Sequence, residues 1–238
     1  MMDHVDLTGK NMTEAELTRE QVIEKLKSTT RQNPADFSSL ALNGLDLSGL
    51  DLSGVNFRAA NMNNTNFENA IMQGAILDQA WMLKANMKNA DLKGASIFQA
   101  QMLDVNLENA NLSGSKIAAN LSRANLKNAK LNGANLSADM RNQSMGLITG
   151  NLSSANLENA DLSDANLSRT ILEFANLKNA KLNNANAEKA QFDGARLENT
   201  DITNTNFKGA DMSSATLINL IGHEKSNLAK AKNVGKLQ

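Results

Sequence analysis

Large apolar residues recur at every fifth position through most of this chain. The series runs unbroken from Leu42 to Ile117. Two residues before each of these centres lies a second small or apolar residue, which is alanine at every repeat from Ala70 to Ala100. Asn, Asp, Ser and Gly dominate the positions between. The pattern therefore predicts two inward positions and three outward positions in each repeat.

A period of five fits neither an α-helix nor a flat strand. In a helix, each step of five residues would rotate the apolar position by about 140°. In a strand, an odd period would move the apolar residue to the opposite face at every repeat. The chain must instead turn once per repeat, and turn-forming residues such as those of Asn111–Gly114 support this. The sequence thus predicts short extended segments wound into a solenoid.

The repeat is clearest in residues 124–136, ANLKNAKLNGANL, and in residues 155–167, ANLENADLSDANL. In these segments the chain resembles the pentapeptide repeat family, whose unit is A-(N/D)-L-x-x, and the resemblance covers about three quarters of the chain. It implies an all-β fold, a right-handed quadrilateral parallel β-helix with four repeats per coil. About nine coils are expected here.

The repeat frame breaks at two places. After Ile117 the next centre is Leu121, which indicates a one-residue deletion near Ala118–Ala119. The segment 137–146 then lacks the pattern, and Leu147 is the next apolar residue in frame. We interpret 137–146 as a bulge or short loop that fills one repeat slot with one residue in excess. Its candidate contact residues are Met140, Arg141, Asn142 and Gln143.

Three regions are expected: an N-terminal cap at 1–38, the β-helix at 39–219, and a C-terminal cap with a basic tail at 220–238. Thr18 and Gln21 form a capping-box pattern that predicts a helix at about 19–30. The open end coils of a solenoid need covers, so this helix is expected to cover the first coil; partner binding is the alternative. Residues from 222 onward are expected to be solvated and mobile.

The last apolar residues of the repeat region have two interpretations. They either close the final coil or form an end-to-end dimer contact. These residues are Leu217, Ile218, Leu220 and Ile221.

Charged residues on one predicted face alternate in sign from coil to coil: Glu68, Lys88, Glu108 and Lys127, with an asparagine two residues before each. Opposite charges on neighbouring coils stabilise a stack, so a structural role is favoured over a functional one. Glu158, Lys178 and Glu198 are expected to repeat the device on another face.

A cluster of apolar residues occupies outward positions where the repeat pattern expects polar ones. Contiguous exposed apolar patches mark interaction sites, and Trp is enriched among interface hot spots. The cluster is therefore a candidate partner surface, unless the chain's own termini cover it. Its members are Ile76, Trp81, Leu83, Phe98 and Leu103.

The composition offers little catalytic chemistry. The chain has 238 residues, net charge −1, no cysteine and two histidines, His4 and His223, near opposite ends. No P-loop, GxGxxG or nucleophile-elbow motif is present, and a coil filled by Leu and Ala leaves no substrate cavity. We expect no enzyme activity, no cofactor and no metal site.

The leading functional hypothesis is a rigid scaffold that presents a flat side to a partner protein. The family resemblance implies an alternative, because some members mimic duplex DNA and bind DNA gyrase, protecting it from quinolones or toxins. The near-zero charge departs from the acidic surface of those members. A secreted bacterial effector is a third hypothesis. Direct nucleic-acid binding is not expected without a basic stripe. No signal sequence or membrane span is found, so the cytoplasm is expected, with specialised secretion left open.

Overall fold

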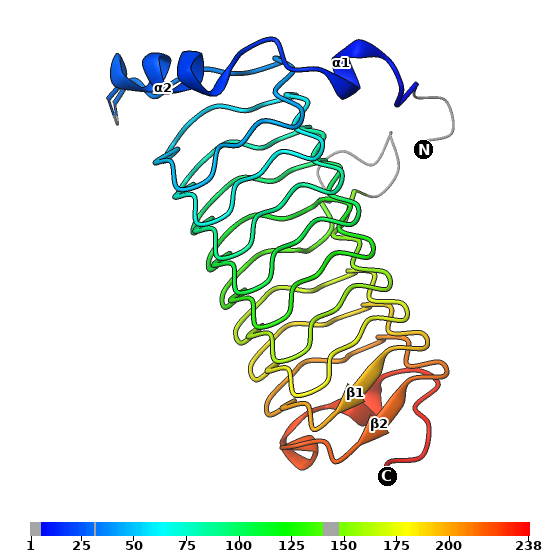
Figure 1. Cartoon of the computed structure of the whole chain (residues 1–238). Helices are drawn as coiled ribbons and strands as arrows, with labels where there is room; N and C mark the ends of the chain where they lie inside the picture. The colour runs from blue at the N-terminus through cyan, green and yellow to red at the C-terminus, as the bar shows by residue number, and fades with distance from the viewer. Residues whose placement is uncertain (1–5, 31, 140–147) are drawn as a thin grey trace.

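The protein is a rod of stacked coils (Figure 1). The computed structural model describes residues 6–30, 32–139 and 148–238. Along most of the rod, parallel bridges join the residue before each centre to the residue twenty positions later, as in Asn61 to Trp81. Four five-residue repeats therefore make one coil. The chain forms a right-handed β-helix solenoid.

The core follows the five-residue pattern. The centre residues from Leu42 to Ile117 are fully buried, and so are the alanines two positions before them. At each corner a turn closes the repeat: Ala80 N donates to Leu77 O at 3.1 Å, and Gln79 between them has φ 62°. This is the left-handed position of a type II turn, which favours Gly or Asn. The chain thus turns every five residues because local turn geometry repeats.

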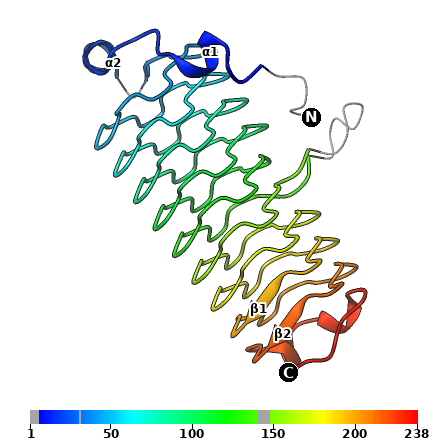
Figure 2. The ribbon, with the colours of Figure 1, turned by 45° about the vertical axis from the view of Figure 1, so that its right-hand side comes forward.

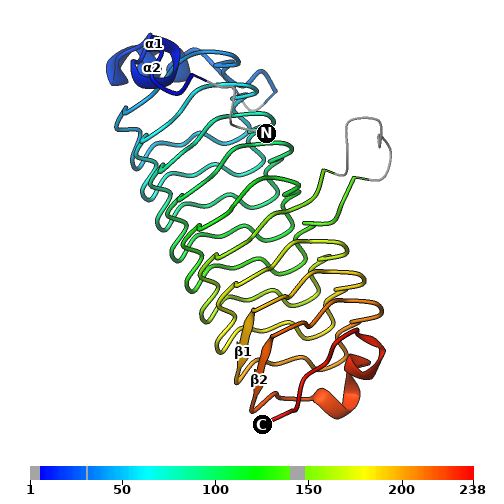
Figure 3. The same cartoon turned by 90° about the vertical axis from the view of Figure 1, so that its right-hand side faces the viewer.

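Helices and named strands lie at the two ends of the rod. At the N-terminal end are α1 (Lys10–Thr13) and α2 (Arg19–Lys27). At the C-terminal end are strands β1 (Arg196–Glu198) and β2 (Thr216–Ile218), which pair in parallel, and the 3-10 helices η1 (His223–Lys225) and η2 (Leu228–Lys230). Figures 2 and 3 show the coils stacked between these elements.

The N-terminal segment packs on the first coils. Thr18 and Gln21 form the capping box at the start of α2, and Val22 is fully buried. The Arg19 guanidinium donates to the carbonyls of Asp46 and Ser48. α2 begins where the sequence pattern places it and ends at Lys27, because Ser28 leaves the helical conformation.

The C-terminal segment forms one more turn of chain over the last coil. Ile221 bridges Asp201, Lys232 bridges Asp211, and Gln238 N donates to Leu217 O at 3.0 Å. Leu228 is only 6% exposed. Most side chains from 222 onward are exposed, as expected for a solvated tail, but the segment lies against the rod. The exposed backbone edge of the last coil holds it by hydrogen bonds.

The coil register changes at two seams. From Gln101 to Asn120 the bridge step is 19, which agrees with the one-residue deletion near Ala118–Ala119. From Asn120 to Asn151 the step is 31, eleven more than the regular step of 20. Asp139 also bridges Ile148 in antiparallel fashion. The insertion therefore fills no repeat slot, and Leu152, not Leu147, is the centre that follows Leu136.

One face of the rod is almost uniform, and we call it the asparagine face. Its outward ladder hydrogen-bonds from amide to amide, as from Asn86 Nδ2 to Asn66 Oδ1 at 3.0 Å. A second asparagine ladder follows the adjoining corner, as from Asn89 to Asn69 at 3.1 Å. The first ladder comprises Asp46, Asn66, Asn86, Asn106, Asn125, Asn156 and Asn176.

The charges of alternating sign lie on the asparagine face both before and after the insertion. Lys127 Nζ lies 3.2 Å from Glu158 Oε2, and Lys178 Nζ lies 2.9 Å from Glu198 Oε1. The expectation that Glu158, Lys178 and Glu198 lie on another face is therefore wrong. That expectation counted the insertion as one five-residue repeat of the coil, but the insertion adds no repeat.

Lys127→Glu is expected to destabilise the protein by about 1 kcal/mol in urea unfolding, because three carboxylates would then stack in sequence. Lys127→Gln, which removes the charge without reversing it, should cost less. The difference between the two variants should shrink in 1 M NaCl, where the Debye length is about 3 Å. Equal stability of both variants at low salt would contradict the electrostatic role.

Candidate interaction face

Residue choice at the corner turns differs between the sides of the rod. The corner that follows the asparagine face and the next corner hold Gly, Asn or Asp, from Gly49 to Asn219 and from Gly54 to Asn204. These residues adopt positive φ most easily. The other two corners include long or bulky side chains at positive φ: Gln79, Gln99, Arg169 and Lys189 on one, and Lys84, Arg123 and Phe174 on the other.

These two corners border one face, which we call the Trp81 face. Its outward ladder runs through Ala41, Asn61, Trp81, Gln101, Asn120, Asn151, Ile171, Gln191 and Asp211. A residue other than Gly in the left-handed region costs about 1 kcal/mol or more. Long side chains therefore line both edges of this face in spite of a conformational cost, which favours a role in binding over a role in folding.

The structure brings the apolar cluster together over neighbouring coils. Trp81, Leu83 and Leu103 belong to the Trp81 face, whereas Ile76 and Phe98 lie on the adjoining face. All five side chains are half-buried, so each keeps part of its surface toward solvent.

The N-terminal segment reaches the start of this face. Asn43 Nδ2 donates to the carbonyls of Asn11 and Glu14, and Asn63 Nδ2 donates to Met12 O at 3.1 Å. Asn63 Oδ1 in turn accepts from Leu83 N at 2.9 Å. These bonds place the segment over the coils that precede Leu83, at one boundary of the apolar cluster.

An ion pair borders the cluster on its other side. Arg123 donates to both carboxylate oxygens of Asp104, at 2.7 and 2.8 Å. Hydrogen bonds from the guanidinium lower the pKa of Asp104 from its usual value. The bidentate pair fixes both side chains beside Leu103 and gives the apolar cluster a polar rim.

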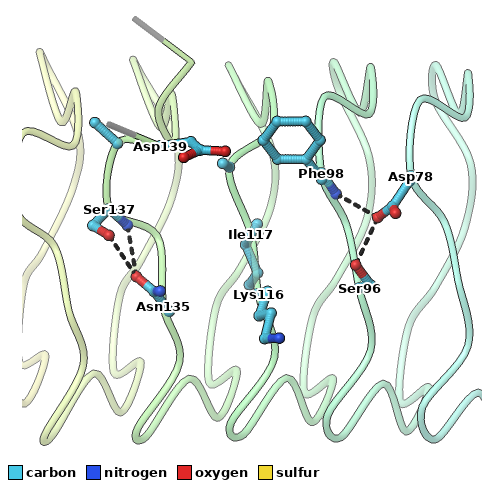
Figure 4. Close-up of a pocket in the computed structure, with 10 residues that line it drawn as sticks. Asp78, Ser96, Phe98, Lys116, Ile117, Asn135, Ser137 and Asp139 are labelled. Carbon is cyan, nitrogen blue, oxygen red and sulfur yellow. Dashed lines mark hydrogen bonds between the residues drawn. The ribbon is translucent and has the colours of Figure 1, made fainter. Parts of the chain in front are cut away.

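A surface cavity of about 510 Å³ opens where the two seams meet (Figure 4). Phe98, Lys116 and Ser137 line it together with Asp78 and Asp139. Ser96 Oγ and Phe98 N both donate to Asp78 Oδ1, at 2.7 and 3.0 Å. The small Ala118 of the deletion leaves room beside the Phe98 ring. The cavity is therefore a hollow in the surface beside the apolar cluster.

The other predicted residues divide into three groups. Met140, Arg141, Asn142 and Gln143 lie outside the described residues, as does His4. At the C-terminal end Leu217 is an inward centre that is 2% exposed, and its carbonyl accepts a hydrogen bond from Gln238 N, whereas Ile221 is 55% exposed. Ile218 and Leu220 are half-buried.

Sequence analysis missed Phe174, which is 64% exposed on an edge of the Trp81 face. Its signal was a phenylalanine at a corner position where Asn or Gly recurs elsewhere. Within the described ranges no group of three or more His, Cys, Asp or Glu residues could hold a metal. The same residues include no helix that is long and apolar enough to cross a membrane.

The family follows from the repeat and its fold. The sequence matches the model of pentapeptide repeats, with 8 copies, over residues 35–74, 51–88, 84–114, 119–138, 151–186 and 190–220. These matches span well over half of the chain, so the protein belongs to the pentapeptide repeat family. A search of curated proteins finds no match.

Several solved structures are similar. QnrB1, a plasmid-mediated fluoroquinolone resistance protein, is 18% identical with a TM-score of 0.53, over 84% of this chain and 91% of that one. HetL from Nostoc sp. strain PCC 7120, a pentapeptide repeat protein involved in heterocyst differentiation regulation, is 24% identical with a TM-score of 0.48, over 94% of this chain and 100% of that one. The likeness to QnrB1 supports the fold. None of these matches indicates a catalytic family.

Proposed function

We propose that this protein is a non-enzymatic scaffold that binds a partner protein through the Trp81 face. In this proposal the rod has about nine coils. Residues 1–38, with α2, cap one end, and residues 220–238 cap the other.

The observation that supports the proposal is the composition of the two corners that border the Trp81 face. Long side chains there occupy left-handed turns that Gly or Asn would fill at lower cost. Between these edges lies the half-buried cluster of Trp81, Leu83 and Leu103. An apolar centre with a polar rim, such as the Asp104–Arg123 pair, is the usual anatomy of a protein interface.

The double variant Trp81→Ala/Leu83→Asp tests this surface. Both side chains point outward, so we expect the variant to fold with an unchanged circular dichroism spectrum. The amount of partner captured from source-cell lysate should fall at least tenfold, because loss of a hot-spot residue costs about 2 kcal/mol or more of binding free energy. Ile71→Ala, which truncates a 41% exposed isoleucine on another face, is the matched control. Equal capture by wild type and the folded double variant would contradict the proposal.

A second candidate partner is DNA gyrase. QnrB1, described as a fluoroquinolone resistance protein, supports it through the shared fold. In this candidate the eleven-residue insertion, whose described ends Asp139 and Ile148 bridge each other at an edge of the Trp81 face, plays the part of the projecting loop found in some gyrase-binding members of the family. The net charge of −1 and the alternating Glu and Lys argue against mimicry of DNA. Inhibition of gyrase supercoiling by the wild type, and not by a variant that lacks 139–149, would favour this candidate.

A further inference from the structure

Phe174 is the most exposed large apolar side chain in the described part of the molecule, at 64%. It occupies the left-handed turn position after Leu172, with φ 56°. Positive φ is a genuine outlier for a bulky residue. Because most of its ring lies outside the core, core packing does not explain why phenylalanine stands there.

A glycine in the next coil accommodates the ring. A Cβ atom added to Gly194 would lie 2.4 Å from Phe174 Cδ1, closer than two such atoms can approach. The ring therefore rests on the backbone of Gly194. Two positions twenty residues apart are thus matched to hold one aromatic ring at the surface.

A groove of about 540 Å³ lies on the same face, and Glu173, which directly precedes Phe174 in the chain, is among the residues that line it. Arg169 and Lys189 line the groove from the far corner, whereas Glu173 and Asp193 directly precede Phe174 and Gly194. The charge therefore changes from positive to negative across the face, toward the ring. Lys232 and Asp211 complete the charged lining.

Glu173 and Asp193 differ from the carboxylates of the asparagine face. They occupy equivalent positions in consecutive coils, where two like charges repel. On the asparagine face a lysine stands between successive glutamates, as Lys178 does between Glu158 and Glu198. Among the described residues no ion pair joins Glu173 or Asp193 to a basic side chain. Although Arg169 and Lys189 line the same groove, they leave these two carboxylates for a positive charge of a partner.

We propose that Phe174, Glu173 and Asp193 bind an arginine side chain of the partner protein. A guanidinium group can stack flat on an aromatic ring while its N–H groups donate to carboxylates. Arg169 and Lys189 then face carbonyl or acidic groups of the same partner segment. This inference rests on the Trp81 face being the interaction face, and it adds the chemistry of the partner.

Three acetylated, amidated pentapeptides test the proposal against the full-length protein by isothermal titration calorimetry: Ala-Arg-Ala-Arg-Ala and its lysine and glutamate counterparts. The arginine peptide should bind at least fivefold more tightly than the lysine peptide. Phe174→Asn and Glu173→Gln should each weaken arginine-peptide binding at least fivefold. Preference for the glutamate peptide, or unchanged binding by Phe174→Asn, would overturn the proposal.

Two controls distinguish a binding role of Phe174 from a structural one, and the arginine site from the apolar cluster. Phe174→Asn should leave the melting temperature unchanged or raise it, because Asn suits the left-handed turn better. A drop of several degrees would assign Phe174 a structural role and overturn the proposal.

Trp81→Ala/Leu83→Asp should still bind the arginine peptide. If that variant also captures the lysate partner as wild type does, the scaffold proposal fails at the apolar cluster while the arginine site stands.

Discussion

Removal of residues 220–238 is expected to lower the melting temperature by at least about 10 °C and to cause aggregation. The segment buries Leu228, and it accepts or donates backbone hydrogen bonds at Ile221, Lys232 and Gln238. Without it, the last coil would expose an open edge of N–H and C=O groups (Figure 3). It would also expose the core side chains of Phe207, Met212 and Leu217.

Circular dichroism melting and size-exclusion chromatography with light scattering measure both effects. Leu228→Asp should reproduce part of the loss without shortening the chain, because Leu228 is 6% exposed. Ile221→Asp is the matched control, since Ile221 is 55% exposed in the same segment. A truncated protein that melts like the wild type and elutes as a single species would show that the segment does not protect the rod end.

The core could be predicted because each repeat is determined locally. Five residues contain both the inward pair and the turn that brings the next pair inward, so the centres from Leu42 to Ile117 follow from spacing alone. The start of α2 also follows from local chemistry, since Thr18 and Gln21 satisfy each other's backbone groups. A cap at 220–238 was expected, but its path over the last coil could not be predicted, because the residues from Gly222 onward lack the five-residue period.

The size of the insertion could not be derived from the period. A frame repeating every five residues reveals only the remainder of an insertion, and eleven residues leave the same remainder as one. Leu147 is in frame by this coincidence. The error moved Glu158 and its successors to the wrong face, which the Lys127–Glu158 ion pair corrects. Phe174 escaped notice for a different reason, since its exposure depends on a backbone angle and on Gly194 in the next coil.

Deletion of residues 139–149, combined with Ala138→Gly, is expected to give a continuous rod that is about 1–2 kcal/mol more stable than the wild type. The deletion brings Leu136 and Leu152 five positions apart, the regular spacing of centres. Gly150 then stands at the inward position two before Leu152, where it is already buried. The gain arises because the chain no longer loses entropy in closing the inserted loop, and Gly at 138 suits the turn.

Deletion of only 139–148, with the same Ala138→Gly change, is the matched control. It leaves Leu136 and Leu152 six positions apart, so every outward residue of that repeat must shift or bulge to keep the core in register. In thermal scans we expect this variant to melt several degrees below the eleven-residue deletion, and in urea it should unfold at a lower concentration.

If the ten-residue deletion were the more stable of the two, Gly150 would not belong to the coil. If both deletions lost cooperative unfolding, the insertion would contribute packing to the rod, and its role would be structural. Retained stability with lost partner capture would instead assign the insertion to the interface at the edge of the Trp81 face.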